Sequence, residues 1–191
     1  TINATGGTAS GSSYGIYATN VLIHDGTVNA TGGTAGSASD NVSCGIGGFY
    51  AVSIFGGTVN ATGGAASGSS YGIYSTSAVL IEDGTVNATG GTAGSASGNV
   101  SCGIGTAERA VISGGVVNAT GGAAYSSYGI EICYEISGGT VVATGGDAVY
   151  DSCGITRVTS NTTFKGGVVV MRGGTASDPT GSSNAYGSDS I

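Results

Sequence analysis

The octapeptide GTVNATGG occurs three times, at residues 26–33, 57–64 and 84–91, and it decides the fold. Related copies follow as GVVNATGG from Gly115, GTVVATGG from Gly139 and GVVVMRGG from Gly167, and the chain opens on TINATGG. Counted from the residue after the glycine, the copies begin at residues 1, 27, 58, 85, 116, 140 and 168. Self-similarity at such a period is typical of repeat architectures, in which each unit packs against its neighbours.

Each unit contains three short runs that read as strands. TVNAT at 27–31 alternates polar and apolar residues, S-[Y/C]-G-I follows at 43–46, and V-x-I precedes the next glycine at 52–54. No stretch shows a helical period, so we expect no helix. The sequence therefore predicts an all-β fold, a right-handed parallel β-helix (β-solenoid) of about seven turns with three short strands per turn. We expect residues 1–191 to form this single repeat domain.

The residue before each Gly-Ile alternates between a large and a small side chain. The series is Tyr14, Cys44, Tyr71, Cys102, Tyr128 and Cys153, and Tyr186 takes the corresponding place before Gly-Ser. In stacked turns, a small Cys between two Tyr rings lets the column interdigitate at core density. Tyr14 has the same strand parity as Ile16, so we expect both side chains to point inward.

The cysteines are predicted to be buried free thiols, with no disulfide. Cys44, Cys102 and Cys153 follow one another at two-turn intervals, which is roughly 9–10 Å from the strand spacing and beyond the usual Cα separation of a disulfide. Cys133 falls in a different part of its turn. The chain has no CxxC and one His, so we expect no metal site.

Composition excludes several classes of partner. Of 191 residues, 40 are Gly, 4 are Lys or Arg, and the formal net charge is −7. So few cations cannot form a footprint for nucleic acid. No stretch approaches about 18 apolar residues, so we expect no membrane insertion.

Candidate catalytic groups are scattered. His24 and Asp25 stand two turns before Glu82 and Asp83, with Phe55 in the intervening turn, so these groups would not converge on one substrate. We interpret them as solvated turn residues. The basic residues also occupy unrelated positions, at Arg109, Arg157, Lys165 and Arg172. Because there is neither a Ser–His motif nor a phosphate loop, we expect no enzymatic activity and no cofactor.

The outward residues of the first run form Thr, Asn and Thr columns on one flat face. The candidate binding residues are Thr27, Asn29, Thr31, Thr58, Asn60, Thr62, Thr85, Asn87, Thr89, Asn118 and Thr120. They would lie about 6.7 Å apart along a strand and about 4.7 Å apart between strands. The same pattern suits a purely structural face, because Thr favours strands and stacked Asn form amide ladders. The Asn residues lie in N-A-T sequons too closely spaced for glycans, which favours a bacterial origin.

Two resemblances bear on function. The text ISGGVVNATGG at 112–122, together with Y-G-I and C-G-I, resembles repeats of large surface proteins of Gram-positive gut bacteria, often described as adhesin-like or carbohydrate-binding. That resemblance implies an exported, wall-attached protein, and hence an extracellular or cell-surface location. The Thr-x-Asn-x-Thr columns are similar to the flat faces of β-solenoid ice-binding proteins, which implies that water ordered on the face could match ice.

The leading expectation is a non-catalytic extracellular repeat module, a stalk or carbohydrate-contacting scaffold of a bacterial adhesin. Its partner would be a glycan or the surface of a host or neighbouring cell. Ice binding is the alternative, and a degenerate polysaccharide lyase or hydrolase is the second. Because Thr1 lies inside a repeat strand, we expect a fragment of a longer chain, with possible end-to-end self-association.

Overall fold

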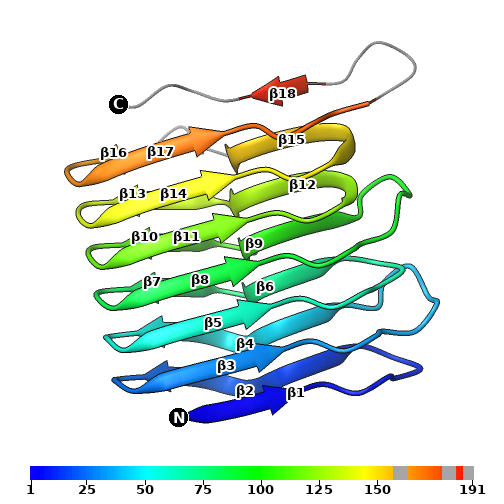
Figure 1. Cartoon of the computed structure of the whole chain (residues 1–191), viewed down its shortest axis with the longest axis horizontal. Helices are drawn as coiled ribbons and strands as arrows, with labels where there is room; N and C mark the ends of the chain where they lie inside the picture. The colour runs from blue at the N-terminus through cyan, green and yellow to red at the C-terminus, as the bar shows by residue number, and fades with distance from the viewer. Residues whose placement is uncertain (157–162, 178–183, 187–191) are drawn as a thin grey trace.

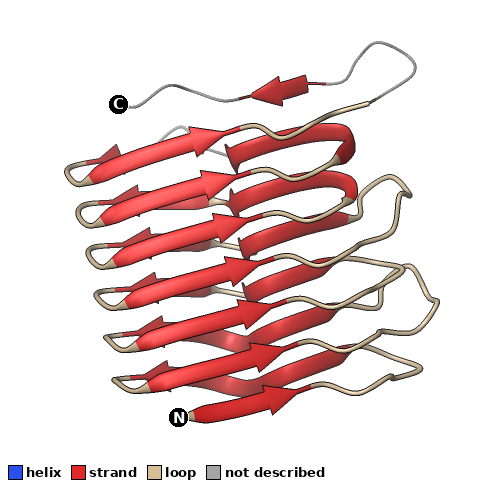
Figure 2. Ribbon diagram, viewed as in Figure 1, coloured by secondary structure: helices blue, strands red, loops and turns tan. Residues whose placement is uncertain are grey.

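The chain forms a parallel β-helix whose turns stack along one axis (Figure 1). The computed structural model describes residues 1–156, 163–177 and 184–186. Within these residues the elements are strands joined by turns and loops, and there is no helix (Figure 2). The front strands run from left to right, the rear strands return, and the chain rises with each turn, so the coil is right-handed (Figure 1).

One face of the coil is a seven-stranded parallel sheet built from the TVNAT runs. Its strands are in register throughout, so that Thr27, Thr58 and Thr85 are paired neighbours. They begin at or one residue after the predicted starts, which confirms the repeat assignment. In order they are β1 (Ile2–Thr5), β3 (Thr27–Thr31), β5 (Thr58–Thr62), β8 (Thr85–Thr89), β11 (Val116–Thr120), β14 (Thr140–Thr144) and β17 (Val168–Arg172).

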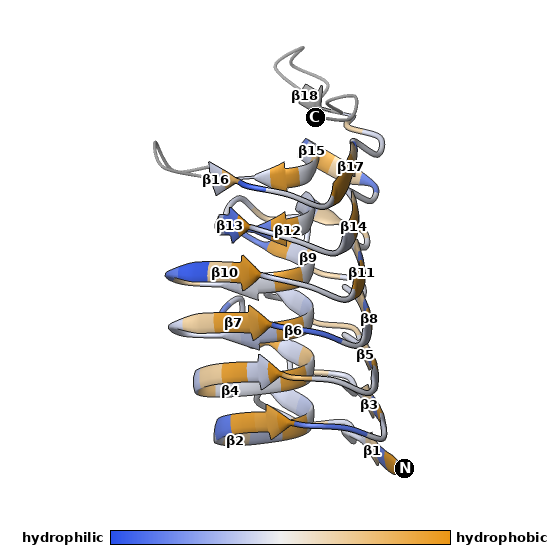
Figure 3. Cartoon of the chain, turned by 90° about the vertical axis from the view of Figure 1, so that its left-hand side faces the viewer, coloured by the Kyte–Doolittle hydropathy of each residue, from blue (hydrophilic) through white to orange (hydrophobic). Residues whose placement is uncertain are grey.

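The other runs form an eleven-stranded sheet that folds around the rest of the coil. Figure 3 shows β7, β10 and β13 running toward the stacked strands of the first sheet. The members are β2 (Ser13–Ile23), β4 (Ser43–Ile54), β6 (Ser70–Ser75), β7 (Ala78–Ile81), β9 (Val100–Thr106), β10 (Arg109–Ile112), β12 (Ala124–Glu131), β13 (Cys133–Ile136), β15 (Ala148–Thr156), β16 (Thr163–Phe164) and β18 (Asn184–Tyr186).

Three strands per turn is correct for the later described turns but not for the first two. In β2 and β4 the second and third runs form one continuous strand. In the next turn the chain breaks at 76–77, where Ser75 Oγ donates to Tyr50 O at 2.7 Å and Thr76 Oγ1 donates to Phe49 O. These hydroxyls donate to carbonyl groups that would otherwise accept hydrogen bonds from backbone amides, so the strand is interrupted there.

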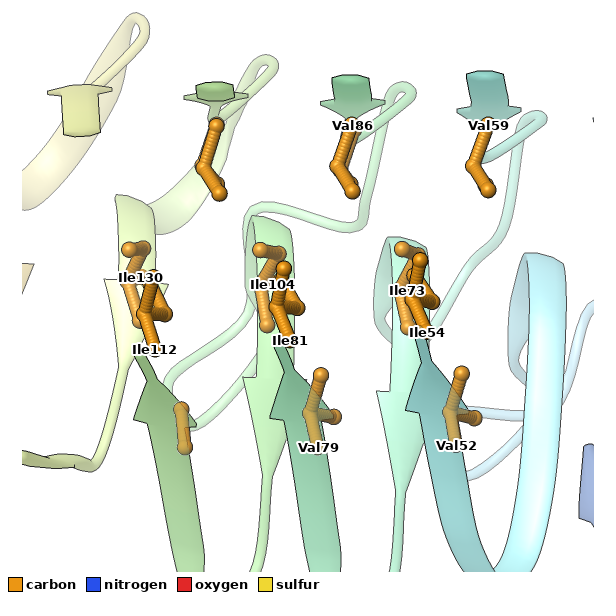
Figure 4. Close-up of a cluster of buried hydrophobic side chains, with 14 of the residues drawn as sticks. Val52, Ile54, Val59, Ile73, Val79, Ile81, Val86, Ile104, Ile112 and Ile130 are labelled. Carbon is orange, nitrogen blue, oxygen red and sulfur yellow. The ribbon is translucent and has the colours of Figure 1, made fainter. Parts of the chain in front are cut away.

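The core consists of aliphatic columns that run along the axis. Val59, Ile73 and Ile81 belong to it with at most 1% exposure, and Figure 4 shows the same three positions repeated turn after turn. One turn alone could not remove these side chains from water, whereas stacked turns bury them in continuous layers. The inward Val and Ala of each TVNAT strand, such as Val28 and Ala30, close this core from the flat face.

Glycine makes the sharp corner between the third run of one turn and the first run of the next. The residue before each flat-face strand from β3 to β17 has a positive φ, between 77° and 94°, a region that favours glycine. The positions are Gly26, Gly57, Gly84, Gly115, Gly139 and Gly167. A reversal at this point returns the chain to the flat face in the register that the stacking needs.

A ladder of buried serines fixes the opposite corner. Ser70 Oγ donates to Gly64 O of its own turn at 2.8 Å and accepts from Gly91 N of the next turn at 3.0 Å. Ser43 makes the equivalent pair of bonds to Gly33 O and Gly64 N. The same arrangement recurs at Ser13, Ser101, Ser127 and Ser152. Each hydroxyl therefore joins consecutive Gly-Gly corners and satisfies backbone groups that would otherwise be buried without partners.

The Tyr/Cys column is confirmed, but its predicted direction is wrong. Cys44, Tyr71, Cys102, Tyr128 and Cys153 pack into a cluster of their own, separate from the aliphatic core that contains Ile46. Ser13 bonds into the Gly-Gly corner, and a Cβ on Gly15 would lie 2.7 Å from Thr31 N of the flat sheet. Positions 13 and 15 thus face inward, and Tyr14 between them faces outward. The strand bends at the glycine, which returns Ile16 to the core.

Candidate functional site

The flat face places all predicted binding residues in continuous columns. Val28 and Ala30 point inward, so Thr27, Asn29 and Thr31 project outward from the same strand. The pairing registers carry this alternation through the sheet as far as Asn118 and Thr120. The first Thr and the Asn columns are half-buried in the central strands, whereas Thr31, Thr62, Thr89 and Thr120 are exposed. The candidate residues are therefore brought together as the sequence predicts.

The Asn column is an unbroken amide ladder. Asn29 Nδ2 donates to Asn3 Oδ1 at 2.7 Å, and Asn60 Nδ2 donates to Asn29 Oδ1 at 2.8 Å. Asn87 and Asn118 continue the series at 2.8 and 2.9 Å. Every central amide thus both donates to and accepts from a neighbouring turn. Much of its hydrogen-bonding capacity goes to holding the turns together, so the exposed Thr side chains at 31, 62, 89 and 120 are the groups of the central strands that are most accessible to solvent.

The charged turn residues lie apart from one another. His24 is exposed and stacks on Phe55, with ring centroids 4.8 Å apart. Glu82 follows Phe55 in the column, since Phe55 N bonds to Ile23 O and Glu82 N bonds to Ile54 O. Asp25 Oδ1 accepts from Gly26 N at 2.6 Å, and Asp83 makes the same bond to Gly84 N. The aspartates therefore shape the glycine corners.

The other basic residues are equally dispersed in the part of the chain that the structure describes. Lys165 Nζ forms an ion pair with Glu135 Oε2 at 2.8 Å, beside β13 and β16. Arg109 begins β10, and Arg172 ends β17. Arg157 lies outside the described residues. Among residues 1–156, 163–177 and 184–186, no group of three His, Cys, Asp or Glu could hold a metal ion. No helix within those same ranges is long and apolar enough to cross a membrane.

All four cysteines are buried thiols that take part in no disulfide. Burial raises the pKa of the Cys44 thiol far above its ordinary value and that of Cys133 to about 12. A thiol held neutral in this way is a poor nucleophile and a poor metal ligand. These side chains therefore serve as small apolar groups in the two packed clusters.

Two features of the site region are absent from the sequence prediction. The serine ladder could have been recognised, because a Ser precedes every Tyr or Cys of the S-[Y/C]-G-I run. The second feature is Glu131, a buried carboxylate at 6% exposure that accepts a hydrogen bond from Cys102 of the Tyr/Cys column. Its signal is a departure from the repeat, since Y-G-I-E at 128–131 replaces the Y-G-I-Y of 14–17 and 71–74.

Comparison with known proteins supports the architecture. A family model described as "Beta helix repeat" matches residues 52–71, 111–130 and 135–155. Each match begins in the strand before a glycine corner and ends in the second run of the next turn. Comparisons with curated proteins and with solved structures give no match. The matched repeats and the stacked parallel turns together identify a β-helix repeat protein.

Proposed function

We propose that this β-helix repeat protein is a non-catalytic extracellular module of a bacterial surface protein, serving as a stalk or as a carbohydrate-contacting scaffold. The observation that carries this proposal is the pair of ladders, Asn on the flat face and Ser at the corner. Both couple consecutive turns through side chains, which suits a stiff spacer. The low content of basic residues is in keeping with a surface that binds neither nucleic acid nor membrane.

The flat face is the surface proposed to contact glycans. Exposed Thr hydroxyls at 31, 62, 89 and 120 form a regular, uncharged row. Such a row offers hydrogen bonds and methyl contacts without the cost of removing water from a charge. A glycan or neighbouring cell surface is the partner that these groups fit.

A glycan array probed with the purified chain tests the proposal. We expect binding that falls about tenfold or more in Thr62→Tyr and Thr89→Tyr, because a bulky ring interrupts the flat row. Thr34→Tyr, at an exposed loop position three residues beyond the end of β3, is the matched control and should bind normally. Release of reducing sugar from any polysaccharide by the purified chain would contradict the non-catalytic assignment.

Ice binding is the second candidate, favoured by the regular spacing of the same exposed Thr row. In parallel strands these hydroxyls repeat at about 4.8 Å, a regular order that could hold water at fixed positions along the row. Thermal hysteresis of the purified chain decides between the two functions. Activity that disappears in Thr62→Tyr and persists in Thr34→Tyr would establish ice binding, whereas its absence in the wild type would eliminate it.

A further inference from the structure

Tyrosine pairs cover the outside of the second strand in alternate turns. Tyr71 and Tyr74 have ring centroids 4.6 Å apart, and Tyr14 and Tyr17 repeat this pair two turns earlier. In the strand register Tyr74 is paired with Gly105 of the next turn. A Cβ on Gly105 would lie 2.5 Å from the Tyr71 ring. Each tyrosine pair thus occupies space that the glycine of the following turn leaves open.

The fifth turn breaks this pattern at Glu131. Continuing the column of Tyr17, Gly47, Tyr74 and Gly105 would place a third tyrosine at this position, but a carboxylate stands there instead. Glu131 is 6% exposed, and Cys102 Sγ donates to its Oε2 at 3.7 Å. Burial, supplemented by the charge of Glu131, raises the pKa of Tyr74. The column therefore changes at this position from a tyrosine ring to a carboxylate that is largely withdrawn from solvent.

The backbone is strained next to this carboxylate. Ile132 has a φ of 54°, the one positive value outside glycine in the described chain. A β-branched residue in the left-handed region is a true outlier, at a cost of about 1–3 kcal/mol. The strand register between β10 and β13 also shifts beside it, between Ala110 and Val111. Such strain persists where the surrounding structure imposes it, and it is concentrated at binding sites.

A cavity of about 290 Å³ opens at this point. The residues that line it include Tyr71, Tyr74, Val100, Thr106, Glu131 and Ile132. No basic residue is among the described residues that line it. The lining therefore combines a carboxylate residue, two tyrosines and aliphatic residues, and the volume is at the small end of the size range of ligand pockets.

We propose that this cavity binds a single neutral sugar residue. Glu131 would accept hydrogen bonds from sugar hydroxyls, and the Tyr74 ring would cover the C–H face of the sugar. The remaining walls match the mixed polar and apolar surface of a pyranose. The site lies on the second strand, away from the flat face, and does not depend on the glycan contact proposed there.

The proposal is tested by titrating the ¹⁵N-labelled chain with methyl glycosides of glucose, galactose, mannose and N-acetylglucosamine. We expect at least one to shift the amide signals of Val100, Thr106 and Ile132 with a millimolar Kd. Glu131→Gln keeps the shape but removes the charge and should weaken binding about tenfold. Tyr74→Ala should weaken it about tenfold or more, whereas Tyr17→Ala, the equivalent position two turns away, should not. Tyr74→Phe serves as the ring-retaining variant if Tyr74→Ala fails to fold.

Three outcomes would overturn the proposal. The first is the absence of shifts around Ile132 with every glycoside at about 100 mM, far above the Kd expected of a one-sugar site. The second is tighter binding of methyl glucuronide or of choline than of any neutral glycoside. The third is binding that shifts the cavity signals but is unchanged in Glu131→Gln. Shifts confined to Thr62 and Thr89 would reject this cavity while supporting the flat face, so the two proposals fail separately.

Discussion

At the scale of single residues, one hydroxyl per turn connects two backbone corners. Ser70 is fully buried and bonds both to Gly64 O and to Gly91 N. A backbone group that loses its partner inside the protein cannot turn to water, so its desolvation is left uncompensated. The serine ladder therefore contributes to stability out of proportion to the size of its side chains.

Ser70→Ala is expected to lower the free energy of unfolding by about 2 kcal/mol, because it leaves a carbonyl and an amide unsatisfied. Urea denaturation followed by circular dichroism measures the change. Ser37→Ala, at an exposed loop position, is the matched control and should remain within about 0.5 kcal/mol of the wild type. Equal stability of the two variants would show that the ladder bonds are replaced by water.

At the scale of elements, the second strand approaches the flat sheet too closely for any side chain at its glycine. A Cβ on Gly72 would lie 2.6 Å from Thr89 N and 2.7 Å from Gly103 O. Both neighbours are backbone atoms of adjacent strands, so neither can move aside without breaking the stack. This glycine therefore sets the thickness of the coil.

We predict that Gly72→Ala destabilises the chain by about 3 kcal/mol or more, or prevents folding. Gly7→Ala is the matched control: no heavy atom lies within 4 Å of its added Cβ, so its stability should change by less than about 1 kcal/mol. Thermal and urea unfolding of both variants provides the comparison. A Gly72→Ala protein as stable as Gly7→Ala would mean that the two sheets can separate freely.

The elements also show how far the sequence determines the structure. The TVNAT alternation predicts the flat sheet, its register and the Asn ladder, because a two-residue period and an exact repeat leave one stacked arrangement. The outward direction of Tyr14 could not be predicted, since parity holds along a regular strand and the chain bends at Gly15. Glu131 is invisible to a search for motifs, because its environment is created by Tyr71 and Cys102 from the two preceding turns.

At the scale of the whole molecule, stacking separates two kinds of titratable group. Carboxylates such as Asp25 and Asp83 lie at exposed corners, whereas Cys44 and Cys133 are completely buried. The thiols are neutral at physiological pH, so their burial then carries no charge penalty. The net charge of −7 is carried largely at the surface, and the aliphatic core contains no charged side chain among the described residues. The buried thiols should therefore lower the stability of the chain at alkaline pH, where they would otherwise ionise.

We predict that the stability of the chain falls above about pH 9, and that Cys133 is one cause. Burial raises its pKa from an ordinary value of 9.0 to about 12 in the folded chain. Between these values the unfolded chain loses the thiol proton while the folded chain retains it, so the free energy of unfolding decreases as pH rises. For one group the slope approaches about 1.4 kcal/mol per pH unit. Below pH 9 both states are protonated, and the slope from this group vanishes.

Urea denaturation under reducing conditions at pH 8, 9, 10 and 11 tests this with the wild type and Cys133→Ala. The variant starts lower because it leaves a small cavity in the core, but it has no thiol to titrate at this position. The difference in stability between the two proteins should therefore shrink steadily from pH 9 to 11. Cys44 and the tyrosines with raised pKa values act equally in both, so they cancel in the comparison. Parallel stability curves over this range would show that water reaches Cys133 and that the stacked core does not exclude it.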